Sequence, residues 1–214
     1  MEGVTTTTST RISQPFKLIL GSSSVARRQI VTEMGYDFTI VTADIDEKGI
    51  RKDKPEELVM ALAEAKADAI VSKLQLSTEN SQEKDAYPTL LLAADTVVVY
   101  DGMVREKPSS KEEAYKFLKD YSGGHAATVG SILVTNLSRG VKKGDWDRVE
   151  IYFHEIPEET INNLIEEGAV LNVAGALIIE HPLIQPCVKE VIGGSDSVMG
   201  LSKALTKKLI KEVL

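Results

Sequence analysis

The fold is decided by the stretch LLLAADTVVVY at residues 90–100, a near-continuous apolar run in a chain of 214 residues. Such a run predicts a central strand that is buried on both faces of a sheet. Asp95 interrupts the run, and a buried carboxylate is unfavourable unless it is paired or binds a cation. Two interpretations of Asp95 stay open: a structural ion pair or strand-end hydrogen bond, and a general base or metal ligand at the end of a strand, where open α/β sheets carry their sites.

A second apolar run, residues 18–20, breaks into a turn of serines and then into two arginines. If the run is a strand and the arginines open a helix, then backbone N–H groups, the hydroxyls of Ser22 and Ser24 and the guanidinium of Arg27 converge as an anion site requires. The alternative is that the serines only cap the helix and that Arg27 and Arg28 are solvated. This segment alone does not decide between the two.

Elements of both kinds alternate irregularly along the chain. The patterns predict strands at residues 18–20, 37–42, 90–100, 127–135, 149–156 and 177–180, and helices at 24–34, 55–74, 110–121, 157–167 and 201–214. Gly35 suits a helix C-terminus, Asp101-Gly102 a hairpin turn, and Ser110 with Glu113 a capping box. Residues 75–88 are polar and are predicted to form a surface loop. The order of elements predicts an α/β domain with a mixed sheet.

Composition excludes several classes of protein. The formal net charge is −7, whereas proteins that bind nucleic-acid backbones concentrate Lys and Arg. No apolar run approaches the length of a membrane span. We therefore expect neither a nucleic-acid partner nor a membrane partner, while one local basic cluster is enough for a small phosphorylated ligand.

The single cysteine and the first residues bear on the compartment. Cys187 has no partner for an internal disulfide or a cysteine metal site, which fits a reducing compartment. Residues 1–15 are rich in Thr, lack the apolar core of a secretory signal and contain Glu2. We interpret them as a disordered cytoplasmic tail, with an organellar address as the alternative. Residues 16–214 are predicted to form a single domain.

Further charged residues complete a set that suits phosphoryl transfer. Lys66 lies on the predicted helix at residues 55–74, and Lys107 lies just past the hairpin turn, from where it could reach toward Asp95. Either lysine taken singly is more often a solvated surface cation. Together with Arg27, Glu47 and Asp95, they supply cations for phosphate oxygens, acids for Mg²⁺ and a base for water. The three histidines are isolated from one another and from the cysteine, so a zinc site or a serine-hydrolase triad has little support.

Six motifs in order resemble those of the Maf family of nucleoside triphosphate pyrophosphatases. They are GSSSVARR at residues 21–28, LAEAKA at 62–67, AADTVV at 93–98, EKP at 106–108, YSGG at 121–124 and AGA at 174–176. The resemblance implies a mixed, twisted α/β sheet in two lobes with a central cleft, similar to inosine triphosphate pyrophosphatase, and often a homodimer. It implies Mg²⁺- or Mn²⁺-dependent hydrolysis of a nucleoside triphosphate at the α-phosphate, which gives a monophosphate and pyrophosphate.

Carried over residue by residue, the resemblance assigns roles to the candidates above. Ser22, Ser24 and Arg27 would hold phosphate oxygens, Lys66 and Lys107 would neutralise the phosphate chain, and Glu47 and Asp95 would bind metal, with Asp95 also accepting the proton of the attacking water. These roles agree with the residue types found without the family.

Three positions that separate substrate classes in the family are mixed in this chain. Thr96 resembles the class that acts on thymidine and uridine triphosphates, Glu180 resembles the class that acts on 7-methyl-guanosine triphosphate, and Ala26 matches neither. A carboxylate at Glu180 suits a guanine N1–H and 2-amino group, although Glu180 directly precedes His181-Pro182 and could equally be a surface residue. The small Ala26 leaves room for a broader or modified base.

Two departures concern the shape of the pocket. The family usually has proline where this chain has Val25, and Gly-Leu-Pro where it has Gly200-Leu201-Ser202. They favour, as an alternative to the enzyme, a nucleotide-binding regulatory module of the same fold with weak or no turnover. A purely structural partner protein is a third interpretation, and it predicts that Asp95 and Glu47 tolerate substitution.

Overall fold

The computed structural model describes residues 14–42, 44–77 and 87–214. The helices are α1 (Val25–Glu33), α2 (Pro55–Ser77), α3 (Lys111–Tyr121), α4 (Glu158–Glu167), α5 (Ser195–Val198) and α6 (Lys203–Val213), with 3₁₀ turns η1 (Glu47–Gly49), η2 (Ala169–Asn172), η3 (Ala174–Ala176) and η4 (Gln185–Cys187). Within these ranges, no helix has both the length and the apolar character needed to cross a membrane. Most of the tail predicted at residues 1–15 lies outside the described residues.

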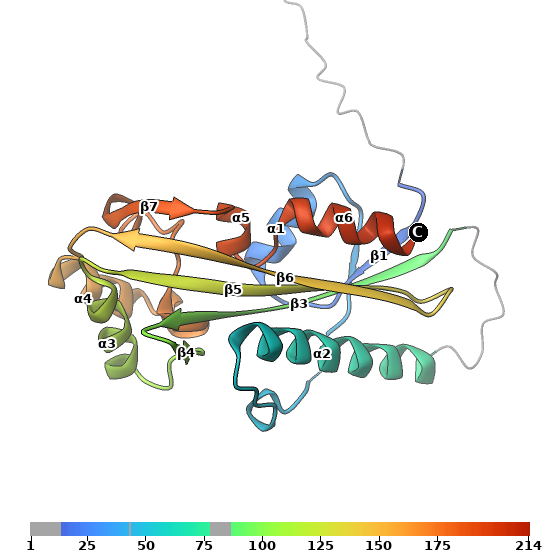
Figure 1. The fold of residues 1–214 in the computed structure, drawn as a ribbon, viewed down its shortest axis with the longest axis horizontal. Coiled ribbons are helices and arrows are strands. Elements are labelled where there is room, and N and C mark those ends of the chain that lie inside the picture. The colour runs from blue at the N-terminus through green and yellow to red at the C-terminus, as the bar shows by residue number, and fades with distance from the viewer. Residues whose placement is uncertain (1–13, 43, 78–86) are drawn as a thin grey trace, which may run out of the picture.

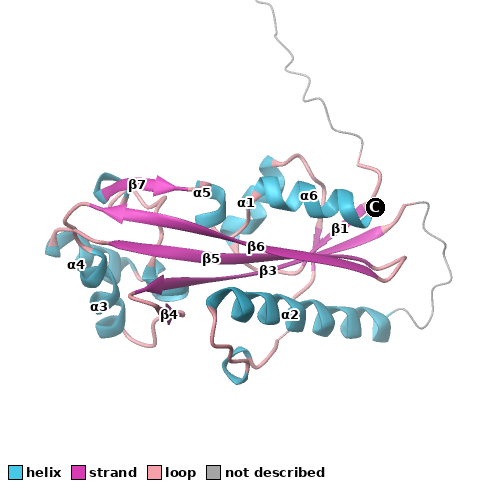
Figure 2. Ribbon diagram, in the orientation of Figure 1, coloured by secondary structure: helices cyan, strands magenta, loops and turns pink. Residues whose placement is uncertain are grey.

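Within the described residues, seven strands form one mixed sheet. Figure 2 shows the strands in magenta. They are β1 (Lys17–Leu20), β2 (Thr39–Ile40), β3 (Thr89–Tyr100), β4 (Met103–Arg105), β5 (His125–Asn136), β6 (Val141–Phe153) and β7 (Val188–Ile192). The order is β2-β1-β3-β5-β6-β7, and β4 also pairs with β3. Strands β2, β1 and β3 are parallel, whereas β4, β5, β6 and β7 pair antiparallel with their neighbours. The predicted mixed α/β sheet is therefore confirmed.

Strand β3 is buried on both faces, as its apolar run predicts. Leu91 and Ala93 pack in a cluster with α2, while Leu90 and Leu92 pack in another with α1 and α6. Figure 1 shows α2 on one side of the sheet and α1 with α6 on the other. Beyond the middle of the strand, Val98 enters a third cluster with α3 and α4.

The edge of β3 that faces β1 is shared by two strands with a gap between them. β1 pairs with residues 89–92 of β3, and β4 pairs with residues 98–100. Between them, residues 93–97 have no strand partner on this edge within the part of the chain that the structure describes. Asp95 and Thr96 therefore lie at an open strand edge, next to the loop that follows β1, whose Gly21 N–H donates to the Leu92 carbonyl at 2.8 Å.

The local signals for helix ends and turns are confirmed. Ser24 is the N-cap of α1, and Gly35 follows the helix with φ of 79°. Asp101 and Gly102, both with positive φ, make the turn between β3 and β4. Ser110 Oγ accepts from the N–H of Glu113 at the start of α3.

Several predicted elements differ from the structure, and the strand predicted at 37–42 is shortened to Thr39–Ile40. No strand covers residues 177–180, because the left-handed residues Gly175 and Ala176 turn the chain there, and the strand that completes the sheet is β7 instead. Strand β6 begins at Val141 rather than at 149. The prediction missed its first half because that half is polar and mostly exposed, so it lacks the apolar pattern of a buried strand. Helix α2 runs on to Ser77, so the loop predicted at 75–88 begins later; its residues 78–86 lie outside the described residues.

Candidate functional site

Asp95, Lys66 and Glu47 form one cluster at the open edge of β3. Lys66 Nζ lies 2.5 Å from Asp95 Oδ1 and 3.0 Å from Glu47 Oε1. The side chains of Lys66 and Asp95 are 17% and 10% exposed, and that of Glu47 is 47% exposed. The cluster therefore has a buried half and a half open to solvent. Asp95 Oδ2 makes no hydrogen bond to any described residue, so it is available to a ligand or to water.

The packing of α2 places Lys66 against Asp95. Val59, Leu62 and Lys66 recur at helical spacing on the face of α2 that packs on the sheet. Ser131, which pairs with Asp95 across β3 and β5, donates from Oγ to the Val59 carbonyl at 2.7 Å. This bond fixes the helix on the sheet close to the carboxylate. The ammonium consequently enters an otherwise apolar interface next to its counter-ion.

Glu47 is presented by a capped 3₁₀ turn. Asp46 is the N-cap of η1 and accepts from the Gly49 N–H at 3.1 Å. Arg51 Nη1 donates to the Glu47 carbonyl at 3.3 Å and lies 3.5 Å from Glu106 Oε1. Arg51 thus connects the turn that carries Glu47 to the segment after β4. Since both charged groups are largely exposed, this contact adds little stability.

The loop between β1 and α1 has the geometry of a helix cap. Ser24 Oγ accepts from the Arg27 backbone N–H at 3.3 Å, and Ser22 Oγ accepts from the Ser24 N–H at 3.2 Å. The capping interpretation therefore describes Ser24. Ser22 is buried, and Gly21 permits a close approach, because a Cβ there would lie 2.8 Å from Ile70 Cδ1. Serine hydroxyls and helix N–H groups still lie together beside the open edge of β3.

Arg27 is held by the protein rather than solvated, so the solvated alternative is wrong for this residue. Its Nε donates to the Gly200 carbonyl at 2.9 Å, its Nη1 to the Ala94 carbonyl at 3.0 Å and to Ser22 Oγ at 3.3 Å. Its Nη2 donates to Thr96 Oγ1 at 3.0 Å. These bonds leave one N–H, on Nη2, for a further acceptor. Burial lowers the pKa of Arg27 below its ordinary value, while the negative charges of Asp95 and Glu47 oppose that shift.

Thr96 and Asp95 point to opposite faces of the sheet, because successive residues of a strand alternate. Asp95 meets Lys66 on the α2 face, and Thr96 meets Arg27 on the α1 face. The position that resembles a specificity residue therefore serves, in this structure, as an acceptor for Arg27. The two groups are joined through the backbone of β3 at its open edge.

Other sequence candidates lie apart from this cluster. Lys107 is exposed and makes no ion pair with Asp95 or with any other described carboxylate, and Lys66 takes that place instead. Glu180 is exposed in the turn after η3. Ala26 is half-buried in the first turn of α1. No hydrogen bond or ion pair among the described residues joins Lys107, Glu180 or Ala26 to Asp95.

The contacts of Ser131, Arg51 and Gly200 with this site were missed by sequence reasoning. The hydroxyl of Ser131 and the carbonyl of Gly200 act through long-range contacts that no local pattern encodes. The signal for Gly200 was available, since it begins the segment that departs from the family's Gly-Leu-Pro. Arg51 lies in a charged stretch, residues 51–57, where nothing distinguishes it from its neighbours.

The donor set of the cluster suits a hard divalent cation. Asp95 and Glu47 offer carboxylate oxygens from two different elements toward the point that Lys66 Nζ occupies between them. Within the described residues, no group of three or more His, Cys, Asp or Glu side chains could hold a metal ion. Mg²⁺ commonly uses one or two carboxylates and completes its shell with water and substrate phosphates, so two carboxylates are enough for this type of site.

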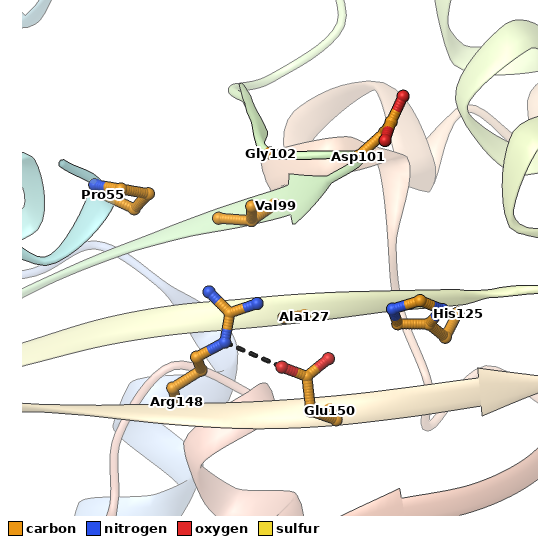
Figure 3. A pocket seen from close by; sticks show the side chains of 8 residues that line it. All are labelled: Pro55, Val99, Asp101, Gly102, His125, Ala127, Arg148 and Glu150. Atoms are coloured by element: carbon orange, nitrogen blue, oxygen red, sulfur yellow. Dashed lines mark hydrogen bonds and ion pairs between the residues drawn. The ribbon is translucent and has the colours of Figure 1, made fainter. Parts of the chain in front are cut away.

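A separate cavity of about 350 Å³ lies on the α2 face of the sheet, at the N-terminal end of that helix, where Pro55 lines it (Figure 3). Val99 and Ala127 line it, as do Arg148 and Glu150, which form an ion pair at 2.7 Å. None of the residues singled out from the sequence as site candidates lines this cavity.

The fold and the cluster define a class: an α/β protein with paired carboxylates and a lysine at an open strand edge, beside a helix N-terminus with serines and a half-buried arginine. The family model described as "Maf-like protein" matches residues 17–213, and this chain belongs to the Maf-like family. The 7-methyl-GTP pyrophosphatase of Dictyostelium discoideum is 34% identical over 92% of this chain and 96% of its own length. A dTTP/UTP pyrophosphatase of Alkaliphilus metalliredigens is 30% identical over 86% of this chain and 90% of its own. A nucleoside triphosphate pyrophosphatase of Salinispora tropica is 26% identical over 94% of this chain and 85% of its own length.

Proposed function

We propose that the protein hydrolyses a nucleoside triphosphate at the α-phosphate to a nucleoside monophosphate and pyrophosphate. The observation that carries the proposal is the cluster of Asp95, Lys66 and Glu47 at the open edge of β3. A carboxylate in a central strand is unfavourable for folding unless it is paired, and here it is paired with a cation from α2 and retains one free oxygen. Relatives that are named as nucleoside triphosphate pyrophosphatases cover nearly the whole chain.

In the proposed reaction, Asp95 acts as the general base. Its Oδ2 takes the proton of a water whose oxygen attacks the α-phosphorus, while the bond from that phosphorus to the bridging oxygen breaks and pyrophosphate leaves. Lys66 holds Asp95 in place and balances the negative charge that develops on the phosphate oxygens. Lys107, exposed after β4, is the second cation proposed for the phosphate chain.

We propose Mg²⁺ or Mn²⁺ as the cofactor, held by Glu47 and Asp95. When bound, such a cation neutralises phosphate charge and polarises the bond that breaks. The carboxylates of Asp95 and Glu47 both lie within 3.0 Å of Lys66 Nζ, so they already face a common cation.

The loop before α1 is proposed to hold the phosphate chain. Ser22 and Ser24 supply hydroxyls, and the first turn of α1 supplies the partial positive charge of a helix N-terminus. Arg27 has one N–H left for a phosphate oxygen, so its larger part in the proposed site is to fix Ser22 and the strand around Asp95.

We propose a purine substrate, 7-methyl-GTP, in preference to UTP or dTTP. Glu180 is exposed and can accept hydrogen bonds from a guanine edge, and Ala26 leaves space beside the loop. Thr96, the one position that resembles the pyrimidine class, is already occupied by Arg27 Nη2. The similarity to the 7-methyl-GTP pyrophosphatase of Dictyostelium discoideum supports the same choice.

The setting of the protein is proposed from its composition and, for the oligomeric state, from the family resemblance. We propose a homodimer that works in the cytoplasm and has no nucleic-acid or membrane partner. Light scattering on the purified protein tests the homodimer, and fractionation of cells tests the compartment and the absence of a membrane partner, both separately from the chemistry.

The test is pyrophosphate release from the purified protein with Mg²⁺ across 7-methyl-GTP, GTP, UTP, dTTP, CTP and ITP. Asp95→Asn is the active-site variant, and Asp101→Asn, the same change in the exposed turn that ends β3, is the matched control. Release that Asp95→Asn abolishes and Asp101→Asn retains supports the proposal. Nucleotide binding without release of pyrophosphate supports the regulatory module instead, and release that survives in Asp95→Asn removes Asp95 from the chemistry.

A further inference from the structure

Two side chains hold α5 and the connection that follows it: Asp147 of β6 and Arg27 of α1. Ser197 Oγ, on α5, donates to Asp147 Oδ2 of β6 at 2.6 Å. The Gly200 carbonyl, a few residues further on, accepts from Arg27 Nε at 2.9 Å. Asp147 is used by no step of the proposed reaction. It lies in one row across the sheet with Gly130 and Thr96: Gly130 pairs in register with Asp147 on one side and with Thr96 on the other.

Asp147 is a half-buried carboxylate close to Thr96, whose hydroxyl accepts from Arg27. Burial raises the pKa of Asp147, and the hydrogen bond from Ser197 works against that rise. A Cβ placed on Gly130 would lie 3.4 Å from Asp147 Oδ1 and 3.6 Å from Thr96 Oγ1. The carboxylate and the threonine hydroxyl therefore flank the same bare position on the α1 face of the sheet.

The α5–α6 connection depends on such bonds because its sequence gives it little stiffness of its own. Ser202 stands where the family has proline, so the restriction that proline places on the backbone is absent. Instead, Ser202 caps α6 by accepting from the Leu205 N–H at 3.3 Å, and Asp196 accepts from the Lys203 N–H at 2.6 Å. These two bonds act within the connection, whereas Asp147 joins it to the sheet.

We propose that Asp147 is a positioning residue for the substrate site. Asp147 fixes α5 through Ser197, and α5 sets the Gly200 carbonyl against Arg27 Nε. Arg27 in turn holds Ser22 and the Ala94 carbonyl, next to Asp95. Asp147 touches no substrate. The inference rests on the proposed function, because it assigns a role in that same site.

The expected effect is on substrate binding more than on turnover. Removing the Asp147 carboxylate leaves the Ser197 hydroxyl without its acceptor and releases the Gly200 carbonyl from its fixed place. The loop with Ser22 is then held less well, while the pair of Asp95 and Lys66 on the opposite face keeps its contacts. We expect KM for the nucleotide to rise about tenfold in Asp147→Ala, with kcat within about twofold of the parent, as for the loss of one charge-assisted hydrogen bond.

The chain offers a matched control. Asp145 is on β6, two residues earlier and on the same face; it forms an ion pair with the exposed Lys208 at 3.2 Å and accepts from the Trp146 backbone N–H at 2.9 Å, and it makes no hydrogen bond to α5. Asp145→Ala is expected to leave KM unchanged. Asp147→Asn keeps an oxygen that accepts from Ser197 and should restore most of the affinity. Ser197→Ala should raise KM in the same direction as Asp147→Ala, although Asp147→Ala also removes the acceptor of the Ser202 hydroxyl. The double variant should add little to Asp147→Ala, because the bond from Ser197 is already lost in that single variant.

Two results would overturn the proposal: KM unchanged in both Asp147→Ala and Ser197→Ala, or KM raised equally by Asp145→Ala. Hydrogen exchange of the peptide at residues 194–202 keeps the test separate from the proposed function. If the parent protein releases no pyrophosphate, the proposed function fails. Even then, faster exchange of this peptide in Asp147→Ala than in Asp145→Ala supports the view that Asp147 positions the connection. Equal exchange in the two variants refutes that view. Should Asp147→Ala not fold, Ser197→Ala, which removes a single oxygen, decides the question by the same measurements.

Discussion

Replacing Gly175 by alanine tests how tightly the turn of η3 packs on β3. Gly175 has φ of 59°, and its amide donates to the Glu106 carbonyl at 2.9 Å while its carbonyl accepts from Tyr121 Oη at 2.9 Å. A Cβ at this position would lie 2.5 Å from Val98 Cβ and 2.8 Å from Tyr121 Oη. Because Val98 Cβ moves only with the backbone of β3, the contact cannot be relieved by rotating a side chain.

The magnitude follows from two additive contributions. The left-handed backbone costs an alanine about 1–2 kcal/mol, and overpacking a tight core position costs about 1–3 kcal/mol. Their sum, about 2–5 kcal/mol, corresponds to a fall in Tm of about 4–20 °C for a chain of this size. Gly140→Ala is the control: Gly140 has φ of 70° and nothing within 4 Å of a Cβ, so only the backbone contribution, about 1–2 kcal/mol, applies.

Thermal unfolding of the two variants, followed by calorimetry or circular dichroism, is the assay. Gly175→Ala should unfold at a clearly lower temperature than Gly140→Ala, and the difference between the two measures the clash with Val98. Equal Tm values for the two variants would refute the reasoning, since they would mean that β3 and η3 separate at no cost.

Three further predictions concern single side chains. Lys66→Met removes the cation between Asp95 and Glu47, and we expect pyrophosphate release to fall at least about 100-fold, as for the loss of a group that stabilises the transition state; a variant with the parent's turnover would contradict this role. Burial raises the pKa of Tyr121 to about 12, so ultraviolet titration should find one tyrosine that ionises well above the ordinary value. The free energy of unfolding should decline as pH rises from the ordinary tyrosine pKa to that of Tyr121, because the folded state keeps a proton that the unfolded state loses. Tyr121→Phe should remove this decline. Burial also raises the pKa of Asp147, so the parent loses free energy of unfolding as pH rises above the ordinary Asp pKa. The Tm of Asp147→Asn relative to the parent should therefore increase from acid to neutral pH. A difference in Tm that does not depend on pH would contradict this expectation.

Local sequence signals predicted the elements that surround the site. The apolar run at residues 90–100 predicted a strand buried on both faces, and Ser24 with Gly35 marked the ends of α1. These features depend on a few neighbouring residues, so a pattern can encode them. The candidate cluster was predicted as a set of residue types for the same reason, since a carboxylate in a buried strand calls for a cation.

The choice between the two lysines depended on tertiary structure. Lys107 is nearer to Asp95 in sequence, but Lys66 reaches it because α2 packs along β3 and is fixed by Ser131. Strand β7 was missed because its exposed Lys189 and Glu190 hide the alternation of a strand, as is common at a sheet edge. The open edge of β3 could not be predicted either, since it exists only because β1 and β4 pair with the same edge at different places.

The register of β3 explains why the two halves of the candidate site stay separate and yet coupled. Asp95 pairs with Ser131 and faces α2, while Thr96 pairs with Gly130 and faces α1. A shift of one residue in this register would exchange the two faces and bury Asp95 against Arg27, away from Lys66. Arg27 opposes such a shift, because it binds the Ala94 carbonyl and the Thr96 hydroxyl on either side of Asp95. The arginine therefore acts on the carboxylate through the strand: it fixes which face Asp95 occupies, and Lys66 then determines how Asp95 is oriented on that face.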